Sequence, residues 1–348
     1  MTNHSFSWKN PKSAKTAAVV RYGAIGDMIQ TSSVFPWLKE QGYHVTLYCQ
    51  HGNGYESVMH DPHVDRFIVQ GRDDVPNSFL GEFWDEERKK YDKWINLSEA
   101  VEGTLLAVPG RAAFDWPNSA RAKLMDRNYL EWMHEVAEVP APYLPKFYST
   151  AKEREKARWT AKKWGRRNVL WSLAGSSGHK VWPHLDAAIA GLMTEYNDVH
   201  VVLVGDDACR LLEQGWGKEP RVHCMSGKWS IRESLAFAEV ADLIIGTETG
   251  LLNAAGAMDV PKIVCLSHSS REMLTKHWKN TISLQQPQGI GCPKSPCRQL
   301  HGSQNTSSWN DCPMHEQTGT ALCQYNIPPQ AMWAAIRVAL KAAEKEAA

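Results

Sequence analysis

The chain has 348 residues, with 39 Lys and Arg against 38 Asp and Glu, so its formal net charge is +1. This near-neutral balance gives no reason to expect a protein that coats nucleic acid, and the length predicts two domains rather than one. The first residues are polar, and no apolar run approaches the roughly 18 residues that a membrane-spanning helix needs. We therefore expect a soluble, cytoplasmic protein.

The first predicted unit is a strand, a glycine-containing turn and a helix. Residues 16–22 read TAAVVRY, GAIGD follows, and residues 28–40 have helical spacing. Gly23 and Gly26 let the strand turn into the helix, and Asp27 falls at the helix start, above the end of the sheet. Asp27 is a candidate proton acceptor, and an ordinary N-cap is the alternative. The absence of a G-x-G-x-x-G fingerprint disfavours an NAD-dependent oxidoreductase.

The rest of the first half continues the alternation of strand and helix. Further strands are expected at 45–49, 66–69 and 94–97, which indicates a parallel sheet with helices on both faces. Polar residues after the last of these strands are candidate acceptor contacts or solvated loop residues: Asn96, Ser98, Glu99 and Glu102. Residues 109–127 are expected to be irregular, and their basic residues either bind an anionic acceptor or are simply solvated.

Residues 140–145, PAPYLP, form the predicted domain boundary because three prolines in six residues resist regular structure. The basic segment 152–167 follows. It is read as an exposed helix with Trp159 and Trp164 facing inward, and the alternative is a nucleic-acid-binding patch.

A second α/β domain is predicted beyond the boundary, with strands at 169–173, 200–204 and 221–225 and helices at 185–196, 207–214 and 231–238. The turn after its first strand is rich in glycine and carries Ser176, Ser177 and Lys180. Two hydroxyls and an ammonium group in such a turn suit a diphosphate.

Residues 241–264 read as strand, turn, helix and strand. The backbone N–H groups at the start of that helix would face an anion above the sheet. The turn residues Thr247, Glu248, Thr249 and Gly250 are therefore expected to face a ligand, with Thr249 capping the helix and Gly250 allowing close approach.

Four cysteines crowd the segment 291–327: Cys292, Cys297, Cys312 and Cys323. A structural zinc site, reduced packing thiols and disulfides all stay open for them. From residue 328 onward the chain is strongly helical in pattern. Its apolar stripe is expected to pack back across the first domain.

Three motifs in this order, RYGAIGD, HKVWP and SGKWSIRESLAFAEVADLIIGTETG, resemble the bacterial ADP-heptose:lipopolysaccharide heptosyltransferases of glycosyltransferase family nine. The resemblance implies the GT-B fold, in which two Rossmann-like parallel-sheet domains face each other across a cleft. It divides the chain into an acceptor domain at 1–145, a nucleotide-sugar donor domain at 146–327 and a C-terminal helix at 328–348.

The resemblance also implies an inverting transfer from a nucleotide-diphosphate sugar to a hydroxyl group, with no metal needed for the chemistry. In that scheme Asp27 is the base, and Ser176 and Lys180 hold the donor phosphates. The segment from Met225 to Lys228 lies beside the nucleobase. The remaining donor contacts are Glu248, Thr249, Gly250 and Asn253.

Two departures from the family pattern leave the donor open. Glu248 stands where the family usually has Asp, and Asn253 where it usually has His, so an ADP-sugar and a UDP-sugar are both candidates. The expected acceptor is a glycan or glycolipid such as a lipopolysaccharide core, handled in the cytoplasm or at the inner face of the membrane. Alternatives are sugar transfer to modified bases of viral DNA and a nucleotide-sugar-binding module without turnover.

Overall fold

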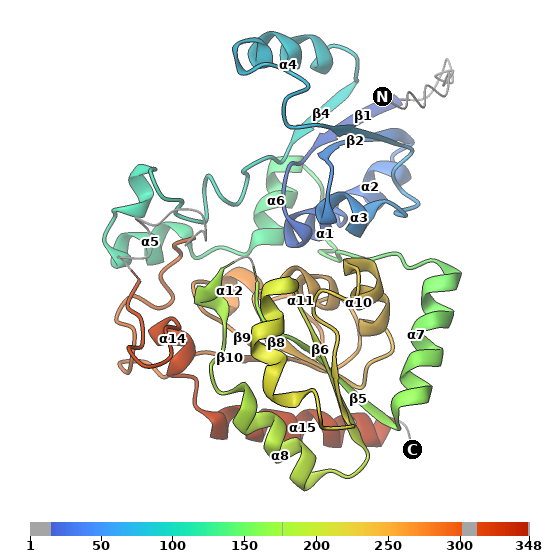
Figure 1. Ribbon diagram of the computed structural model, residues 1–348. Helices are drawn as coiled ribbons and strands as arrows, with labels where there is room; N and C mark the ends of the chain where they lie inside the picture. The colour runs from blue at the N-terminus through green and yellow to red at the C-terminus, as the bar shows by residue number, and fades with distance from the viewer. Residues whose placement is uncertain (1–14, 176, 301–311, 347–348) are drawn as a thin grey trace.

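The computed structural model describes residues 15–175, 177–300 and 312–346. The chain forms two α/β domains stacked one above the other, each built on a sheet of parallel strands (Figure 1). The predicted class, two Rossmann-like domains that face each other, is confirmed.

The first sheet has the strand order β3-β2-β1-β4, with every neighbouring pair parallel. Alternate residues of its central strand serve opposite faces, because Ala17 and Val19 join the large core while Ala18 and Val20 pack in a smaller aromatic cluster with Trp84. The strands are β1 (Lys15–Val20), β2 (Tyr43–Gln50), β3 (Arg66–Gln70) and β4 (Lys93–Asn96). Helices α1 (Ile25–Thr31), α2 (Phe35–Glu40), α3 (Asn53–Val58) and α6 (Tyr129–Ala137) lie toward the second domain, and α4 (Leu80–Arg88) covers the far face (Figure 1).

The second sheet has the order β10-β9-β8-β5-β6-β7, again all parallel. Its strands are β5 (Arg167–Ser172), β6 (Val199–Val204), β7 (Val222–Cys224), β8 (Leu243–Thr247), β9 (Lys262–Cys265) and β10 (Thr281–Leu284). Helices α10 (Ile231–Ala238) and α11 (Gly250–Ala255) face the first domain, whereas α8 (Leu185–Glu195) and α15 (Pro329–Glu346) cover the opposite face. The other helices are α5 (Asn118–Met125), α7 (Ala151–Trp164), α9 (Arg210–Glu213), α12 (Arg271–Leu274) and α14 (Leu322–Tyr325).

The two domains are packed through α1 and α11. One apolar cluster runs from the first sheet through these helices into the second sheet. Gly250 is needed at the contact, since a Cβ atom at this position would lie 2.5 Å from the Cβ atom of Ile25. The start of α11 therefore lies directly against the helix that carries Asp27.

Three sequence predictions need correction at the level of secondary structure. The single helix expected at 28–40 is two helices, α1 and α2, and Pro36 stands in the first turn of α2, where its missing N–H group is tolerated. Helix α1 already begins at Ile25, so Asp27 lies inside its first turn. The segment 109–127 is not wholly irregular, because it contains α5.

The C-terminal helix packs on the second domain and not back across the first. In α15 the apolar stripe that includes Met332, Ile336 and Leu340 joins the core formed with α8 and the second sheet (Figure 1). The physical reason is that α8 would otherwise be the only long helix on this face of the second sheet. Within the described residues, none of the helices is both long and apolar enough to cross a membrane.

Helix α7 also differs from its prediction. Trp164 faces inward and stacks on His223 with ring centroids 4.0 Å apart, but Trp159 points outward with 63% of its surface exposed. Ala157 and Trp164 lie on one side of the helix, and Trp159 falls on the other because of the 3.6-residue repeat. Residues 139–150, which contain the proline-rich boundary, connect α6 with α7 without regular secondary structure, as predicted.

Candidate active site

A cleft of about 650 Å³ lies between the domains, at the carboxyl ends of strands from both sheets. This is a normal size for a site that takes a cofactor-sized ligand. Its first-domain wall includes Asp27, Gln30, Glu102 and Tyr129, and its second-domain wall includes Lys180, Asp206, Trp229, Glu248, Thr249, Gly250, Asn253 and His268. The structure therefore brings Asp27 and Lys180 to opposite walls of one cavity.

Asp27 is fixed by two donors and still faces the cleft. Its Oδ1 lies 2.9 Å from Nη2 of Arg21, and its Oδ2 accepts a hydrogen bond from the backbone N–H of Ala24 at 2.8 Å. The side chain keeps 29% of its surface exposed. Gly23 makes room for this arrangement, since a Cβ atom there would lie 2.5 Å from the Cβ of Asp27. The N-cap of α1 is Ala24, so the expectation of Asp27 as an ordinary N-cap is wrong; Asp27 is the third residue of the helix, and its contact with Ala24 leaves the carboxylate open to the cleft.

Arg21 links Asp27 to a second carboxylate. Its fully buried guanidinium donates to Glu102 with both Nη atoms, at 2.8 and 3.1 Å, and to the carbonyl oxygen of Leu97 at 2.8 Å. Burial opposes the charge, but the two carboxylates outweigh it and raise the pKa of Arg21 above its ordinary value. Four residues that follow the fourth strand were predicted as acceptor contacts. Of these four, Glu102 lines the cleft and the others do not.

Lys180 is the ammonium group on the donor side. It is half-buried, and its Nζ donates to the backbone carbonyl of Glu248 at 3.1 Å, which places it beside the turn that opens α11. Burial lowers the pKa of Lys180, while the carboxylates of Glu248 and Asp27 act in the opposite direction. A bound anion would complete the solvation of this charge.

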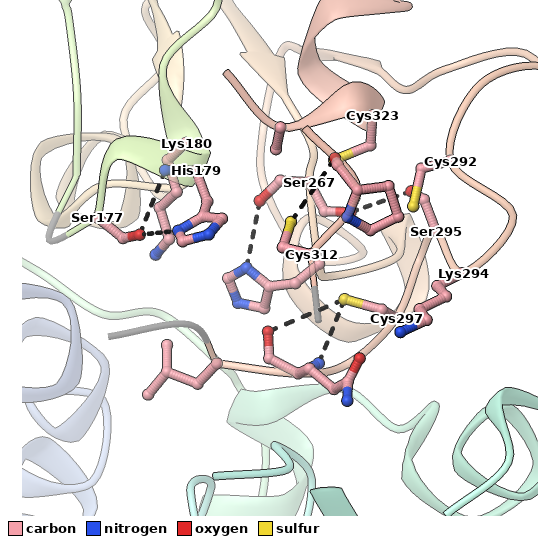
Figure 2. A pocket seen from close by; sticks show the side chains of 15 residues that line it. Ser177, His179, Lys180, Ser267, Cys292, Lys294, Ser295, Cys297, Cys312 and Cys323 are labelled. Atoms are coloured by element: carbon pink, nitrogen blue, oxygen red, sulfur yellow. Dashed lines mark hydrogen bonds between the residues drawn. The ribbon is translucent and has the colours of Figure 1, made fainter. Parts of the chain in front are cut away.

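Of the two serines predicted in this turn, Ser177 is placed differently from Lys180. Ser177 does not line the large cleft; its Oγ lies 2.6 Å from Nδ1 of His179 and caps a short 3₁₀ turn, and it faces a second, smaller cavity. Figure 2 shows Ser177, His179 and Lys180 at one end of that cavity. Ser176 lies outside the described residues.

The turn before α11 lies where it was predicted, but two of its side chains are used by the protein itself. Thr249 caps α11 through the N–H of Leu252 and accepts from Ser172. Asn253 accepts from Gln30 at 2.8 Å and donates to the carbonyl of Thr249 at 3.0 Å. The amide of Asn253 therefore joins the donor turn to the helix that carries Asp27.

The segment predicted to lie beside a nucleobase is only partly in the cleft. Met225 is half-buried against the large core, and Lys228 is exposed and donates to the carbonyl of Cys224 at 2.7 Å. Gly227 and Trp229 line the cleft instead.

Five of the cleft residues named above were missed by the sequence reasoning. They are Gln30, Tyr129, Asp206, Trp229 and His268. A signal existed for Asp206 and His268, because each stands within four residues of the end of a predicted strand, where ligand contacts in α/β sheets lie. No local signal marks Tyr129, which reaches the cleft only through the packing of distant segments.

The four clustered cysteines converge on the smaller cavity (Figure 2). All eight cysteines lie in the described part of the chain, and none of them is paired in a disulfide there. Burial raises the pKa of the Cys297 thiol to about 11 and that of Cys312 to about 12, and the neighbouring thiols add to both shifts. Among the described residues, no three potential ligand side chains are arranged to hold a metal ion.

Comparisons with known proteins agree with this geometry. Residues 88–299, more than half of the chain, match the sequence profile of glycosyltransferase family 9 (heptosyltransferase). A search of curated proteins found no match.

Solved structures share the fold at low sequence identity. The E. coli ADP-heptose LPS heptosyltransferase II is 14% identical, with a TM-score of 0.65 and coverage of 94% of this chain and 99% of that one. A family 9 glycosyltransferase from Veillonella parvula DSM 2008 is 16% identical, with a TM-score of 0.64 and coverage of 94% and 97%. The iron-containing dodecameric glycosyltransferase TibC from enterotoxigenic E. coli H10407 is 13% identical, with a TM-score of 0.54 and coverage of 95% and 77%.

The profile match, the paired parallel sheets and the cleft between them lead to one conclusion: this chain belongs to glycosyltransferase family 9, the heptosyltransferase family.

Proposed function

We propose that the chain is an inverting glycosyltransferase that moves a sugar from a nucleotide-diphosphate sugar to a hydroxyl group of a glycan or glycolipid, such as a lipopolysaccharide core. The observation that carries the proposal is a single cleft with Asp27 on its first-domain wall and Lys180 on its second-domain wall. ADP- and UDP-sugars are both candidate donors. We place the reaction in the cytoplasm, with the inner face of the membrane as the alternative site.

In the proposed reaction, Asp27 accepts the proton of the acceptor hydroxyl while the oxygen bonds to the anomeric carbon of the donor. The bond from that carbon to the diphosphate breaks, and its electron pair leaves with the diphosphate. Lys180 offsets the negative charge that grows on the leaving group. Attack from the face opposite the leaving group inverts the anomeric centre. The scheme needs no metal ion, because a protein cation already serves the diphosphate.

A thermal-stability screen tests donor binding most simply. A nucleotide sugar at a hundred times its dissociation constant should add about 2.7 kcal/mol to the free energy of unfolding. ADP-sugars should be tried first, because the E. coli structure named for ADP-heptose shares the fold over 94% of this chain. If no nucleotide sugar and no nucleoside diphosphate raises the melting temperature, the proposal is wrong.

The same screen, followed by an assay, separates an enzyme from a binding module. An enzyme with a positioned base should hydrolyse its donor slowly when no acceptor is present, since water can take the place of the acceptor hydroxyl. The fixed carboxylate of Asp27 favours turnover, because a sensor needs no base there. Donor binding without any release of nucleoside diphosphate, even with a panel of acceptors, would favour the binding module.

Glu102→Gln should lower the rate of transfer. Arg21 is shared between the carboxylates of Asp27 and Glu102, and with Glu102 neutral it gives its whole charge to Asp27, which makes Asp27 a weaker base toward the acceptor hydroxyl. We expect a moderate loss of kcat with little change in donor affinity, measured by steady-state kinetics and calorimetry. Glu99→Gln is the matched control, because Glu99 is exposed and pairs with Arg111 outside the cleft. An unchanged rate would show that Arg21 does not couple the two carboxylates.

DNA as the acceptor is a second candidate, and the observation that favours it is the outward face of α7. Exposed Trp159 lies among the exposed basic residues Lys152, Lys156, Arg158, Lys162 and Lys163. If DNA is the acceptor, duplex DNA should stimulate donor turnover, and the effect should fall steeply as salt rises. Turnover on a glycan acceptor with little dependence on salt would exclude it.

A structural metal at the cysteine cluster is a separate proposal. Four thiols facing one cavity are the right ligands for zinc or iron, and the TibC structure is described as iron-containing. The described arrangement does not yet form a metal site, so the sulfur atoms would have to move together. Metal analysis of the purified protein, and of a Cys312→Ser variant, tests this. An equal metal content in both proteins would refute it.

A further inference from the structure

The carboxylate of Glu248 holds the side chain of His268 in place. Its Oε1 accepts from the backbone N–H groups of Ser267 and Ser269, at 2.9 and 3.0 Å, and its Oε2 accepts from Ser267 Oγ and lies 2.7 Å from Nδ1 of His268. Burial would raise the pKa of Glu248, but His268, Lys180 and Ser267 hold it at about 2. Glu248 is therefore an ionised buried carboxylate whose oxygens are already taken by protein groups.

Asn253 is used in the same way, since its amide is shared between Gln30 and the carbonyl of Thr249. The two positions at which this chain departs from the family pattern thus direct their side chains to the protein. If a donor diphosphate lies in the cleft, the side chains best placed to contact it are those that still have an unused polar atom.

His268 is one such side chain. It follows β9 in the loop that leads to α12, is 9% exposed and lines both the large cleft and the smaller cavity, as Lys180 does. Its Nδ1 is engaged by Glu248 and by Ser267 Oγ at 3.2 Å. Among the described residues, none forms a hydrogen bond with its Nε2.

The chemistry of this pair suits an anion. The carboxylate of Glu248 accepts from Nδ1 of His268, which leaves Nε2 as the ring nitrogen open to a ligand. A histidine ring that carries both protons donates from Nε2 to an anion. Together with Lys180, such a ring would give the cleft two cationic donors beside the same turn.

We propose that His268, oriented by Glu248, is a ligand of the donor diphosphate. The inference rests on the proposed function. When the bond from the anomeric carbon to oxygen breaks, the electron pair stays on the diphosphate, and Lys180 and His268 both donate hydrogen bonds to it. The proton of the acceptor goes to Asp27, so His268 gives up no proton.

The test compares binding of a nucleoside diphosphate with binding of the matching nucleoside by calorimetry, using ADP and adenosine or UDP and uridine. His268→Gln should weaken diphosphate binding about tenfold and leave nucleoside binding unchanged. His268→Lys should recover part of the loss, since it restores a cation. His51→Gln, at an exposed histidine outside the cleft, should change neither.

Three results would overturn the inference: unchanged diphosphate binding in His268→Gln, an equal loss of nucleoside and diphosphate binding, or a loss seen only with the complete nucleotide sugar. If His268→Gln does not fold, His268→Asn is measured in the same way. Failure of the wild-type protein to bind any nucleoside diphosphate would instead refute the proposed function, so the two failures are distinguishable.

Discussion

Replacing Asp27 by Asn should lower turnover by about 10²–10⁴-fold, the usual contribution of general base catalysis, and leave nucleoside diphosphate affinity nearly unchanged. Asn keeps the shape and can still accept the hydrogen bond from Ala24, but it cannot take up the proton of the acceptor hydroxyl. Steady-state rates together with calorimetric binding check both parts of this expectation.

Asp259→Asn is the matched control for Asp27. Asp259 is an exposed carboxylate paired with Lys279 on the surface of the second domain, so its loss should change neither rate nor affinity. The melting temperature of Asp27→Asn should be measured as well, because the carboxylate also pairs with buried Arg21. A well-folded Asp27→Asn protein with near-normal turnover would remove Asp27 as the base.

Lys180→Ala should act mainly on the donor. A hydrogen bond to a charged group contributes about 1.5–3 kcal/mol, so diphosphate binding should weaken roughly 10- to 150-fold. Turnover at saturating donor should also fall, because the charge that grows on the leaving group loses a cation. Binding curves and saturation kinetics separate the two effects.

Lys228→Ala serves as the control for Lys180. Lys228 is exposed, donates only to a neighbouring carbonyl and does not line the cleft, although it was predicted from the sequence to lie near the donor. We now expect its removal to leave donor affinity within about twofold, as for ordinary surface substitutions. An equal loss of donor affinity in both variants would mean that the protein attracts the donor by its general positive charge and does not bind it through Lys180.

Much of the fold could be predicted from the sequence because its elements carry local signals. The apolar strands, the glycine turn after β1 and the proline-rich boundary each reflect short-range chemistry, and nine of the strands, β1 to β9, appear close to their predicted places. The position of Asp27 followed from the same reasoning, since the residue after a strand-to-helix turn lies above the sheet.

The errors concern packing partners, which short segments do not specify. The apolar stripe of α15 is visible in the sequence, but nothing local says which sheet face it covers. Trp159 and Trp164 are both bulky and apolar, yet the turn of the helix lets only one of them face inward. Strand β10 was not predicted, because four residues give too little pattern.

The candidate active site likewise combines residues that local sequence predicts with residues that only the packing of the chain brings together. Lys180 lies in the cleft as predicted from its turn, whereas Ser177, three residues before it, turns to the smaller cavity. His268 gains its place from Glu248, twenty positions earlier in the chain, and Glu102 gains its place from Arg21. Such pairs depend on the arrangement of distant loops, so the sequence alone could not show them.

The most direct test is a crystal structure with the nucleotide sugar that stabilises the protein best, in a form that cannot react, such as a 2-deoxy-2-fluoro sugar. We predict that the diphosphate lies against Lys180 and His268, and that the anomeric carbon faces Asp27 across an opening wide enough for the acceptor oxygen. A nucleotide bound outside this cleft, or a sugar whose anomeric carbon faces away from Asp27, would contradict the account.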